Sequence, residues 1–295
     1  MLRKREGLLT PLLLVLGIQT AGLMGYRLLN PFACNQDFRF APLVAPLVLA
    51  LHGLTGHGRR WAPLAADLPD HRIVAPDLLG HGSSSWEPPW SYGAHLDALE
   101  LLVVDLGRPL TIVAHSFGGA LAIRLAQRLP DRITALVLLD PAQGLDPSRA
   151  LDVATNGMAN WTYPSPEAAY SAKRAEGWAA VPDAILDEEI AVHLRPSEQV
   201  GLPAGRFAWR VSQPAAAVAW SEMATPAQLP PPGLPTDIVI ADRVDPPFID
   251  AAFLAACANE RADSVRIHHA DCEHMVPFLE PGLVADLVRA AVGRG

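Results

Sequence analysis

One stretch near the middle of the chain, residues 110–126, constrains the fold more than any other. It begins with the apolar, β-branched run Leu-Thr-Ile-Val, which is typical of a strand buried on both faces. It ends with Gly118-Gly119 and a segment of helical propensity and period. Between them, Ser116 has the small residues Ala114 and Gly118 two positions away on either side. This pattern favours a sharp strand-to-helix turn with the hydroxyl of Ser116 exposed at its apex; an ordinary turn with a capping serine is the alternative.

Predicted strands and helices alternate through most of the chain. Buried apolar runs predict strands at residues 46–52, 72–78, 135–140, 237–241 and 264–268. Helical periodicity predicts helices at residues 60–68, 92–106, 249–258 and 282–292. The alternation predicts an α/β fold, a mostly parallel central sheet with helices on both faces. Ligands of such sheets bind beyond the carboxyl ends of the strands.

Residues 143–233 interrupt this alternation. They carry four of the seven tryptophans, show patchy helix signals and end in a proline-rich exit. Because the segment is too long for a loop in a compact domain, we expect an inserted helical cap over the carboxyl edge of the sheet. The α/β core is then formed by residues 36–142 and 234–295. Before the first buried strand, residues 38–44 leave room for one further strand at most.

The stretch around Ser116 resembles the G-x-S-x-G nucleophile elbow of the α/β-hydrolase superfamily, with Ala114 in place of the first glycine. The resemblance extends over most of residues 46–142 and 234–294 and implies a serine hydrolase with an inserted cap. It implies that Ser116 is the catalytic nucleophile. His274, in a short loop between the last strand and the final helix, matches the family's catalytic histidine, although Glu273 stands where the family usually has glycine.

The resemblance also points to the acid of the triad. Asp245 matches the aspartate of the family's strand followed by Gly-x-x-Asp, and the order Ser116, Asp245, His274 is the order that this fold uses. Asp242, nearer the end of that strand, is a rival. Asp140 is the other rival because it ends the preceding strand, where some relatives have the acid.

Two backbone N–H groups are expected to form the oxyanion hole. Phe117 follows the nucleophile at the start of its helix, and Leu54 lies in the segment His52-Gly-Leu-Thr-Gly56, which resembles the family's His-Gly-x-x-Gly loop. Residues 77–84 resemble the family's Asp-x-x-Gly-His-Gly-x-Ser segment, for which we expect a structural role.

These residues predict hydrolysis of a carboxylic ester through an acyl-enzyme. The tryptophan- and alanine-rich cap favours a small or medium apolar acyl substrate. A C–C bond hydrolase, thioesterase, amidase or acyltransferase would use the same triad, and a non-catalytic ligand-binding protein is the alternative from another class. The resemblance calls for no metal or organic cofactor. The oligomeric state is left open.

Charge and cysteine content exclude other classes. The net charge of −8 and the lack of basic clusters after the first few residues argue against a nucleic-acid partner. The three cysteines have no metal-ligand spacing, so no zinc site is indicated. A bridge between Cys257 and Cys272 is conceivable in an exported protein, but we expect free buried thiols.

Residues 1–30 form a distinct N-terminal segment. Three basic residues precede a mostly apolar run at residues 7–26, about the ~20 residues that span a bilayer. The pattern favours a signal peptide or membrane anchor, with contact between residues 7–26 and a membrane. The alternatives are an apolar helix docked on a cytoplasmic domain, and a start codon placed too early, with Met24 nearer the true one.

Overall fold

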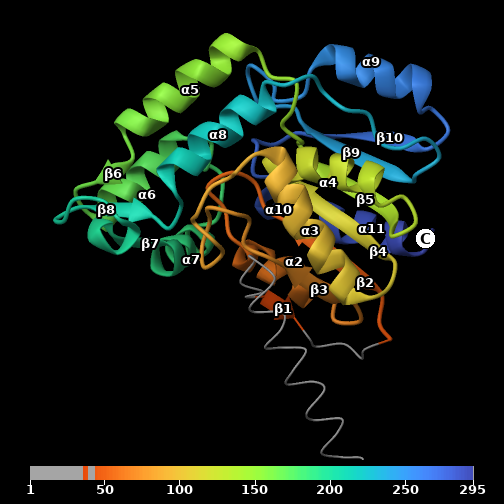
Figure 1. Cartoon of the computed structure of the whole chain (residues 1–295), viewed down its shortest axis with the longest axis horizontal. Coiled ribbons are helices and arrows are strands. Elements are labelled where there is room, and N and C mark those ends of the chain that lie inside the picture. Colours follow the sequence, from red (N-terminus) through yellow and green to blue (C-terminus); the bar gives the residue numbers. More distant parts are fainter. Residues whose placement is uncertain (1–35, 39–43, 295) are drawn as a thin grey trace, which may run out of the picture.

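The structure, a computed structural model, describes residues 36–38 and 44–294. Seven strands form one sheet in the order β1-β3-β2-β4-β5-β9-β10, in which β1 pairs antiparallel with β3 and the other pairs are parallel (Figure 1). The strands are β1 (Gln36–Phe38), β2 (Leu47–Leu51), β3 (Arg72–Ala75), β4 (Leu110–His115), β5 (Ile133–Leu139), β9 (Thr236–Ala241) and β10 (Val265–Ala270). The predicted α/β fold with a mostly parallel sheet is confirmed.

Two apolar cores, one on each face, cover this sheet. Along β2, Leu49 and Leu51 belong to one core, whereas Val48 and Ala50 belong to the other, because successive side chains of a strand point to opposite faces. The first core is completed by helices α3 (Tyr92–Leu106), α4 (Phe117–Arg128) and α9 (Ala251–Glu260). The second is completed by α2 (Ala62–Asp67), the preceding 3₁₀ turn η1 (Gly58–Trp61), α10 (Val276–Leu279) and α11 (Pro281–Val292). Burial on both faces explains the continuous apolar runs of the strands.

The strand and helix boundaries follow local chemistry. β3 ends at Ala75, three residues earlier than predicted, because Pro76 has no N–H to continue the ladder. A short helix, α10, precedes α11, and Pro281 begins the second of the two. A lead-in strand is present as β1 at Gln36–Phe38, and most of the predicted range 38–44 lies outside the described residues.

Between β5 and β9 the chain forms four helices and a second, three-stranded antiparallel sheet in the order β6-β8-β7. The elements are α5 (Pro147–Ala159), β6 (Thr162–Tyr163), α6 (Pro166–Ala175), α7 (Asp183–His193), β7 (Leu194–Pro196), the 3₁₀ turn η2 (Ser197–Val200), β8 (Phe207–Trp209) and α8 (Gln213–Met223). They gather to one side of the main sheet (Figure 1). The expected helical cap thus also holds a small sheet, whose two- and three-residue strands are too short for a periodic signal.

Three of these helices start on capping residues. Asp146, Ser165 and Ser212 accept hydrogen bonds from the N–H groups of Arg149, Ala168 and Ala215, at the starts of α5, α6 and α8. A proline follows each cap within two residues and pre-sets the helical φ angle. We refer to residues 143–233, the segment between the two parts of the core, as the cap.

Two further sequence-based expectations concern the N-terminal segment and the cysteines. The predicted signal or anchor at residues 1–30 lies outside the described residues. In the part of the chain that the structure describes, no helix combines the length and apolarity needed to cross a bilayer. Cys257 and Cys272 are both free and buried, as expected, and burial raises the pKa of each thiol to about 11.

Candidate active site

Ser116 stands at a sharp turn between β4 and α4. Its backbone has φ 53° and ψ −121°, a conformation that L residues rarely adopt, and its N–H donates to the carbonyl of Leu139 at 3.0 Å. A methyl group on Gly118 would come within 2.6 Å of the carbonyl oxygens of Leu51 and His52, so only glycine fits there. Tight packing at Gly118 therefore helps to hold the turn in its strained form. The predicted geometry at Ser116 is present.

His274 lies in the loop between β10 and α10 and is bonded to a buried carboxylate. Its Nδ1 is 2.5 Å from Oδ2 of Asp140, whose side chain is 1% exposed. Asp140 directly follows β5, and its Oδ1 accepts the N–H of Ala241 at 3.3 Å. Since a carboxylate accepts hydrogen bonds, Nδ1 of His274 is the donor in this contact.

The expected pairing of Asp245 with His274 is wrong. Asp245 is exposed on the loop after β9, and the carboxylate at His274 belongs to Asp140. Asp242, the other rival, pairs with His269 at 2.8 Å on the exposed surface. The loop turns outward after β9, so that Phe248 rather than Asp245 comes back against His274, with 4.3 Å between the ring centroids.

His115 fixes the backbone of the His274 loop. Its Nε2 donates to the carbonyl of His274 at 2.8 Å, and the two rings lie 4.6 Å apart. Burial, reinforced by His274, lowers the pKa of His115 well below its usual value, so His115 is neutral and serves as a fixed donor. His115 thus has a structural role at this loop.

The loop after β2 runs directly against Ser116. A methyl group on Gly53 would lie 2.9 Å from Cβ of Ser116, so Leu54 follows within the immediate surroundings of the serine. Among the described residues, no acceptor bonds the N–H of Leu54. Phe117 is the first residue of α4, where an N–H has no partner within the helix. Both predicted oxyanion donors thus lie beside Ser116 with their N–H groups available.

Buried histidines hold this loop in shape. Nε2 of His52 accepts the N–H of Leu78 at 2.9 Å, and Nε2 of His81 accepts the N–H of Thr55 at 3.3 Å. Burial lowers the pKa of His52 to about 3 and that of His81 well below its usual value, which keeps both rings neutral and able to accept.

Asp77 stabilises the backbone of the neighbouring loops. Its carboxylate accepts the N–H groups of Gly58 at 2.8 Å and Ser83 at 2.9 Å, which ties the segment 77–84 to the turn before α2. These contacts agree with the structural role expected for that segment.

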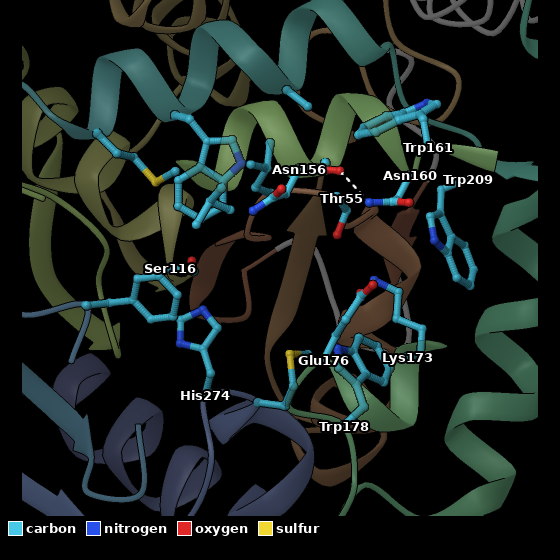
Figure 2. Close-up of a pocket in the computed structure, with 18 of the residues that line it drawn as sticks. Thr55, Ser116, Asn156, Asn160, Trp161, Lys173, Glu176, Trp178, Trp209 and His274 are labelled. Carbon is cyan, nitrogen blue, oxygen red and sulfur yellow. Dashed lines mark hydrogen bonds and ion pairs between the residues drawn. The ribbon is translucent and has the colours of Figure 1, made fainter. Parts of the chain in front are cut away.

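Ser116 and His274 line one cavity of about 490 Å³ between the core and the cap. Figure 2 shows the two residues together at one side of it, while Trp178, Trp209, Lys173 and Glu176 lie at the opposite side. Most of the remaining lining is apolar or aromatic: Leu54, Val153, Trp161, Tyr163, Ala216, Trp220, Met223, Phe248 and Met275. Residues of both the core and the cap thus form the cavity. Within the described part of the chain, no cluster of three or more His, Cys, Asp or Glu side chains is arranged to hold a metal ion.

A buried ion pair joins the cap to the loop beside Ser116. Arg60 donates to Glu189 of α7 through Nη2 at 2.5 Å and Nε at 3.1 Å, and Nη2 also donates to the carbonyl of Thr55 at 3.0 Å. His57 lies 2.9 Å from the same carboxylate. Burial alone would raise the pKa of Glu189, but Arg60 and His57 hold it well below its usual value. Glu189 is therefore a buried carboxylate whose charge is balanced by the core.

Sequence reasoning missed three cavity residues: Arg60, Arg149 and Lys173. Arg149 donates to the carbonyl of Pro247 at 2.7 Å and lies over the ring of Phe248. No motif surrounds any of the three. The one available signal was the presence of Lys173 in a segment that was expected to cover the site.

Comparison with known proteins agrees with this architecture. Residues 47–287 match the family model described as Alpha/beta hydrolase family. The chain is 43% identical over 256 residues to "Lipase LipV" of Mycobacterium tuberculosis, covering 86% of this chain and 96% of that protein. Among solved structures, it is similar to E-2-(acetamidomethylene)succinate hydrolase with a TM-score of 0.70 and 19% identity, covering 84% of this chain and 92% of that one. An M. tuberculosis esterase gives a TM-score of 0.62 and 22% identity, with 84% and 86% covered.

The two structural matches show the fold, and the sequence match extends over nearly the whole of both chains. The sequence match adds a relative named as a hydrolytic enzyme, so the chain is an enzyme of the hydrolase class similar to lipases and esterases. With the family model spanning most of the core and the cap, the chain belongs to the α/β hydrolase family.

Proposed function

We propose that this enzyme hydrolyses a carboxylic ester through an acyl-enzyme formed on Ser116. The observation that carries the proposal is the hydrogen bond between His274 Nδ1 and the buried carboxylate of Asp140, in a loop that lines the same cavity as Ser116. A serine hydroxyl is a weak nucleophile until a base removes its proton, and a carboxylate keeps that base in the right tautomer. The triad of this proposal is Ser116, His274 and Asp140.

In the first half of the reaction, Nε2 of His274 takes the proton of the Ser116 hydroxyl while the oxygen attacks the ester carbonyl. The negative charge that develops on the carbonyl oxygen is stabilised by the N–H groups of Leu54 and Phe117. The tetrahedral intermediate collapses when His274 gives its proton to the departing alcohol. Asp140 stabilises the imidazolium between these two proton transfers.

In the second half, water enters from the cavity and His274 removes one of its protons. The hydroxide attacks the acyl-enzyme carbonyl, and the same N–H groups stabilise the second tetrahedral intermediate. His274 returns the proton to the oxygen of Ser116, which releases the carboxylic acid. The aromatic and apolar lining supports an acyl group with a largely apolar body, and the similarity to a protein named as a lipase points the same way.

A graded series of p-nitrophenyl esters, run beside matched thioesters and amides, tests the proposal. We expect the esters to be hydrolysed and Ser116→Ala to lower kcat by roughly 10⁴- to 10⁶-fold while the protein remains folded. A serine-directed fluorophosphonate should label the wild-type enzyme and not the variant.

Other outcomes would contradict this function in distinct ways. Retention of more than a few per cent of the activity in Ser116→Ala would mean that the nucleophile is elsewhere. Faster turnover of thioesters or amides would assign a different reaction to the same triad. No labelling and no turnover of any substrate would indicate a ligand-binding protein.

A further inference from the structure

A lysine side chain in the cap is buried beside the cavity that holds Ser116. Lys173 lies on α6 and is 5% exposed. Its Nζ is 4.9 Å from the centroid of the Trp209 ring and 5.5 Å from that of Trp178. A buried ammonium is costly unless charges or hydrogen bonds compensate it, so its place in a mostly apolar wall needs a reason. The faces of the two indole rings provide part of that compensation.

The charge partner of Lys173 leaves much of its binding capacity unused. Oε2 of Glu176 is 3.6 Å from Nζ, which is longer than the roughly 2.7–2.9 Å of a charge-assisted N–H···O bond. The Glu176 side chain is 53% exposed, so it shares its charge with solvent. An ammonium has three N–H donors, and burial lowers the pKa of Lys173 despite this carboxylate.

The two other cations of the cavity wall are already occupied. Arg60 is held by Glu189 and the carbonyl of Thr55, and Arg149 donates to a backbone carbonyl. Among the described residues, the cavity wall holds the carboxylate of Glu176 against two cations, Arg149 and Lys173, because the charge of Arg60 is balanced by Glu189. The balance of charge in the wall therefore favours a negatively charged group, and Lys173 is the buried cation whose carboxylate partner is largely exposed to solvent.

The position of Lys173 fits a group remote from the reacting carbonyl. Figure 2 shows Lys173 and Glu176 with their ends close together inside the pocket, across it from Ser116 and His274. The lining as a whole is largely apolar and aromatic, and Figure 2 shows the polar residues Thr55, Asn156 and Asn160 between the two sides. A substrate that reaches both sides would therefore have an ester at one end, an apolar body and a charged group at the other end.

We propose that Lys173 binds a carboxylate carried by the substrate, so that the preferred substrates are esters with an apolar chain that ends in a carboxylate. This rests on the proposed ester hydrolysis at Ser116 and names its substrate class. On binding, the substrate carboxylate replaces Glu176 as the ion-pair partner of the Lys173 ammonium. The side chain of Glu176 then rotates outward to the solvent.

Paired substrates test this. Each p-nitrophenyl ester of an acyl chain that ends in a carboxylate is compared with the ester of equal length that ends in a methyl group, and the ratio of the two kcat/KM values is measured. The acyl length is varied to find the best fit. We expect the ratio to fall roughly 10- to 100-fold in Lys173→Met, since a charge-assisted hydrogen bond contributes about 1.5–3 kcal/mol. Lys173→Arg, which keeps the charge, should restore part of the ratio.

Two further variants separate this role from a structural one. Glu176→Gln removes the competing carboxylate and should raise the ratio several-fold, an effect that a merely structural Lys173–Glu176 pair would not produce. Arg206→Met removes an exposed cap cation that bonds Thr162 and does not line the cavity, so the ratio should stay at the wild-type value. A second substrate set carries the carboxylate on the alcohol side, and hydrolysis is followed by acid release. The set whose kcat/KM ratio falls in Lys173→Met identifies which half of the ester, acyl or alcohol, reaches the cap.

The outcomes distinguish this proposal from the proposed function. Ester hydrolysis that requires Ser116 but shows the same ratio in wild type and Lys173→Met, for both substrate sets, overturns the carboxylate site alone. Ester hydrolysis that is absent, or that persists in Ser116→Ala, overturns the function on which it rests.

Discussion

Replacing Asp140 by asparagine should disable the enzyme without unfolding it. The substitution keeps the size of a side chain that is 1% exposed and removes the carboxylate 2.5 Å from Nδ1 of His274. If the amide NH₂ faces Nδ1, that nitrogen must become an acceptor, and the proton moves to Nε2. His274 is then unable to take the proton of Ser116, and the imidazolium loses its neighbouring negative charge.

The expected loss is large because both effects act on the proton transfer. A change of this kind typically lowers kcat by roughly 10⁴-fold. At about 1.36 kcal/mol for each factor of ten, this corresponds to about 5.4 kcal/mol of transition-state stabilisation. The assay is kcat for a p-nitrophenyl ester, with the thermal unfolding midpoint measured on the same preparation to confirm that the variant is folded.

Asp245→Asn and Asp242→Asn are the matched controls. Asp245 is exposed, and Asp242 pairs with an exposed histidine, so each substitution should change kcat by less than about twofold. The assignment of the acid to Asp140 would be refuted if Asp140→Asn lost less than tenfold in kcat, or if Asp245→Asn lost more than Asp140→Asn.

The other predictions concern stability. Glu189→Ala leaves Arg60 buried without its partner and should lower the free energy of unfolding, measured in urea, by about 3–5 kcal/mol. Its control, Glu188→Ala, breaks an ion pair whose side chains are both 51% exposed and should cost under about 1 kcal/mol. Equal losses in the two variants would contradict this prediction. Gly118→Ala forces a methyl group within 2.6 Å of two backbone carbonyl oxygens and should lower the free energy of unfolding by about 1–3 kcal/mol, with a loss of activity. Its control, Gly282→Ala, is exposed and has open space around it, so it should raise the melting temperature slightly. Burial lowers the folded-state pKa of His52 to about 3, so this histidine is protonated in the unfolded chain at a higher pH than in the folded protein. Stability should therefore fall as the pH drops from about 6.5 toward 3, by up to about 1.36 kcal/mol per pH unit for this histidine. Urea unfolding at a series of pH values should show that decline, and a flat profile would contradict it.

The sequence predicted the parts of this molecule that depend on local patterns. Ser116, Gly118 and the apolar run before them specify a strand, a tight turn and a helix within seventeen residues, and β4 and α4 are found there. The predicted helix at residues 92–106 has the same bounds as α3, because Ser91 caps its start and Gly107 ends it in the left-handed conformation.

The parts that depend on the conformation of the loops were not predictable. Asp140 and Asp245 both follow strands of the same sheet, and β5 and β9 are neighbours in it, so the pattern could not decide which carboxylate meets His274. The outward path of the loop after β9 decides, and no local signal marks that path. Lys173 is similar: its burial results from packing against Trp178 and Trp209, which lie on other parts of the cap.

Backbone strain supports Asp140 independently of its hydrogen bond. Among the described residues, the non-glycine positions with positive φ are Thr55, Ser116 and Asp140, at 59°, 53° and 43°. They follow β2, β4 and β5, three consecutive neighbours in the sheet, so all lie at one carboxyl edge. Each such conformation costs on the order of 1–3 kcal/mol and persists only where the surroundings enforce it. One strained residue follows the predicted oxyanion donor Leu54, one is the proposed nucleophile, and the third binds His274. At Asp140 the positive φ thus coincides with the contact between its carboxylate and His274.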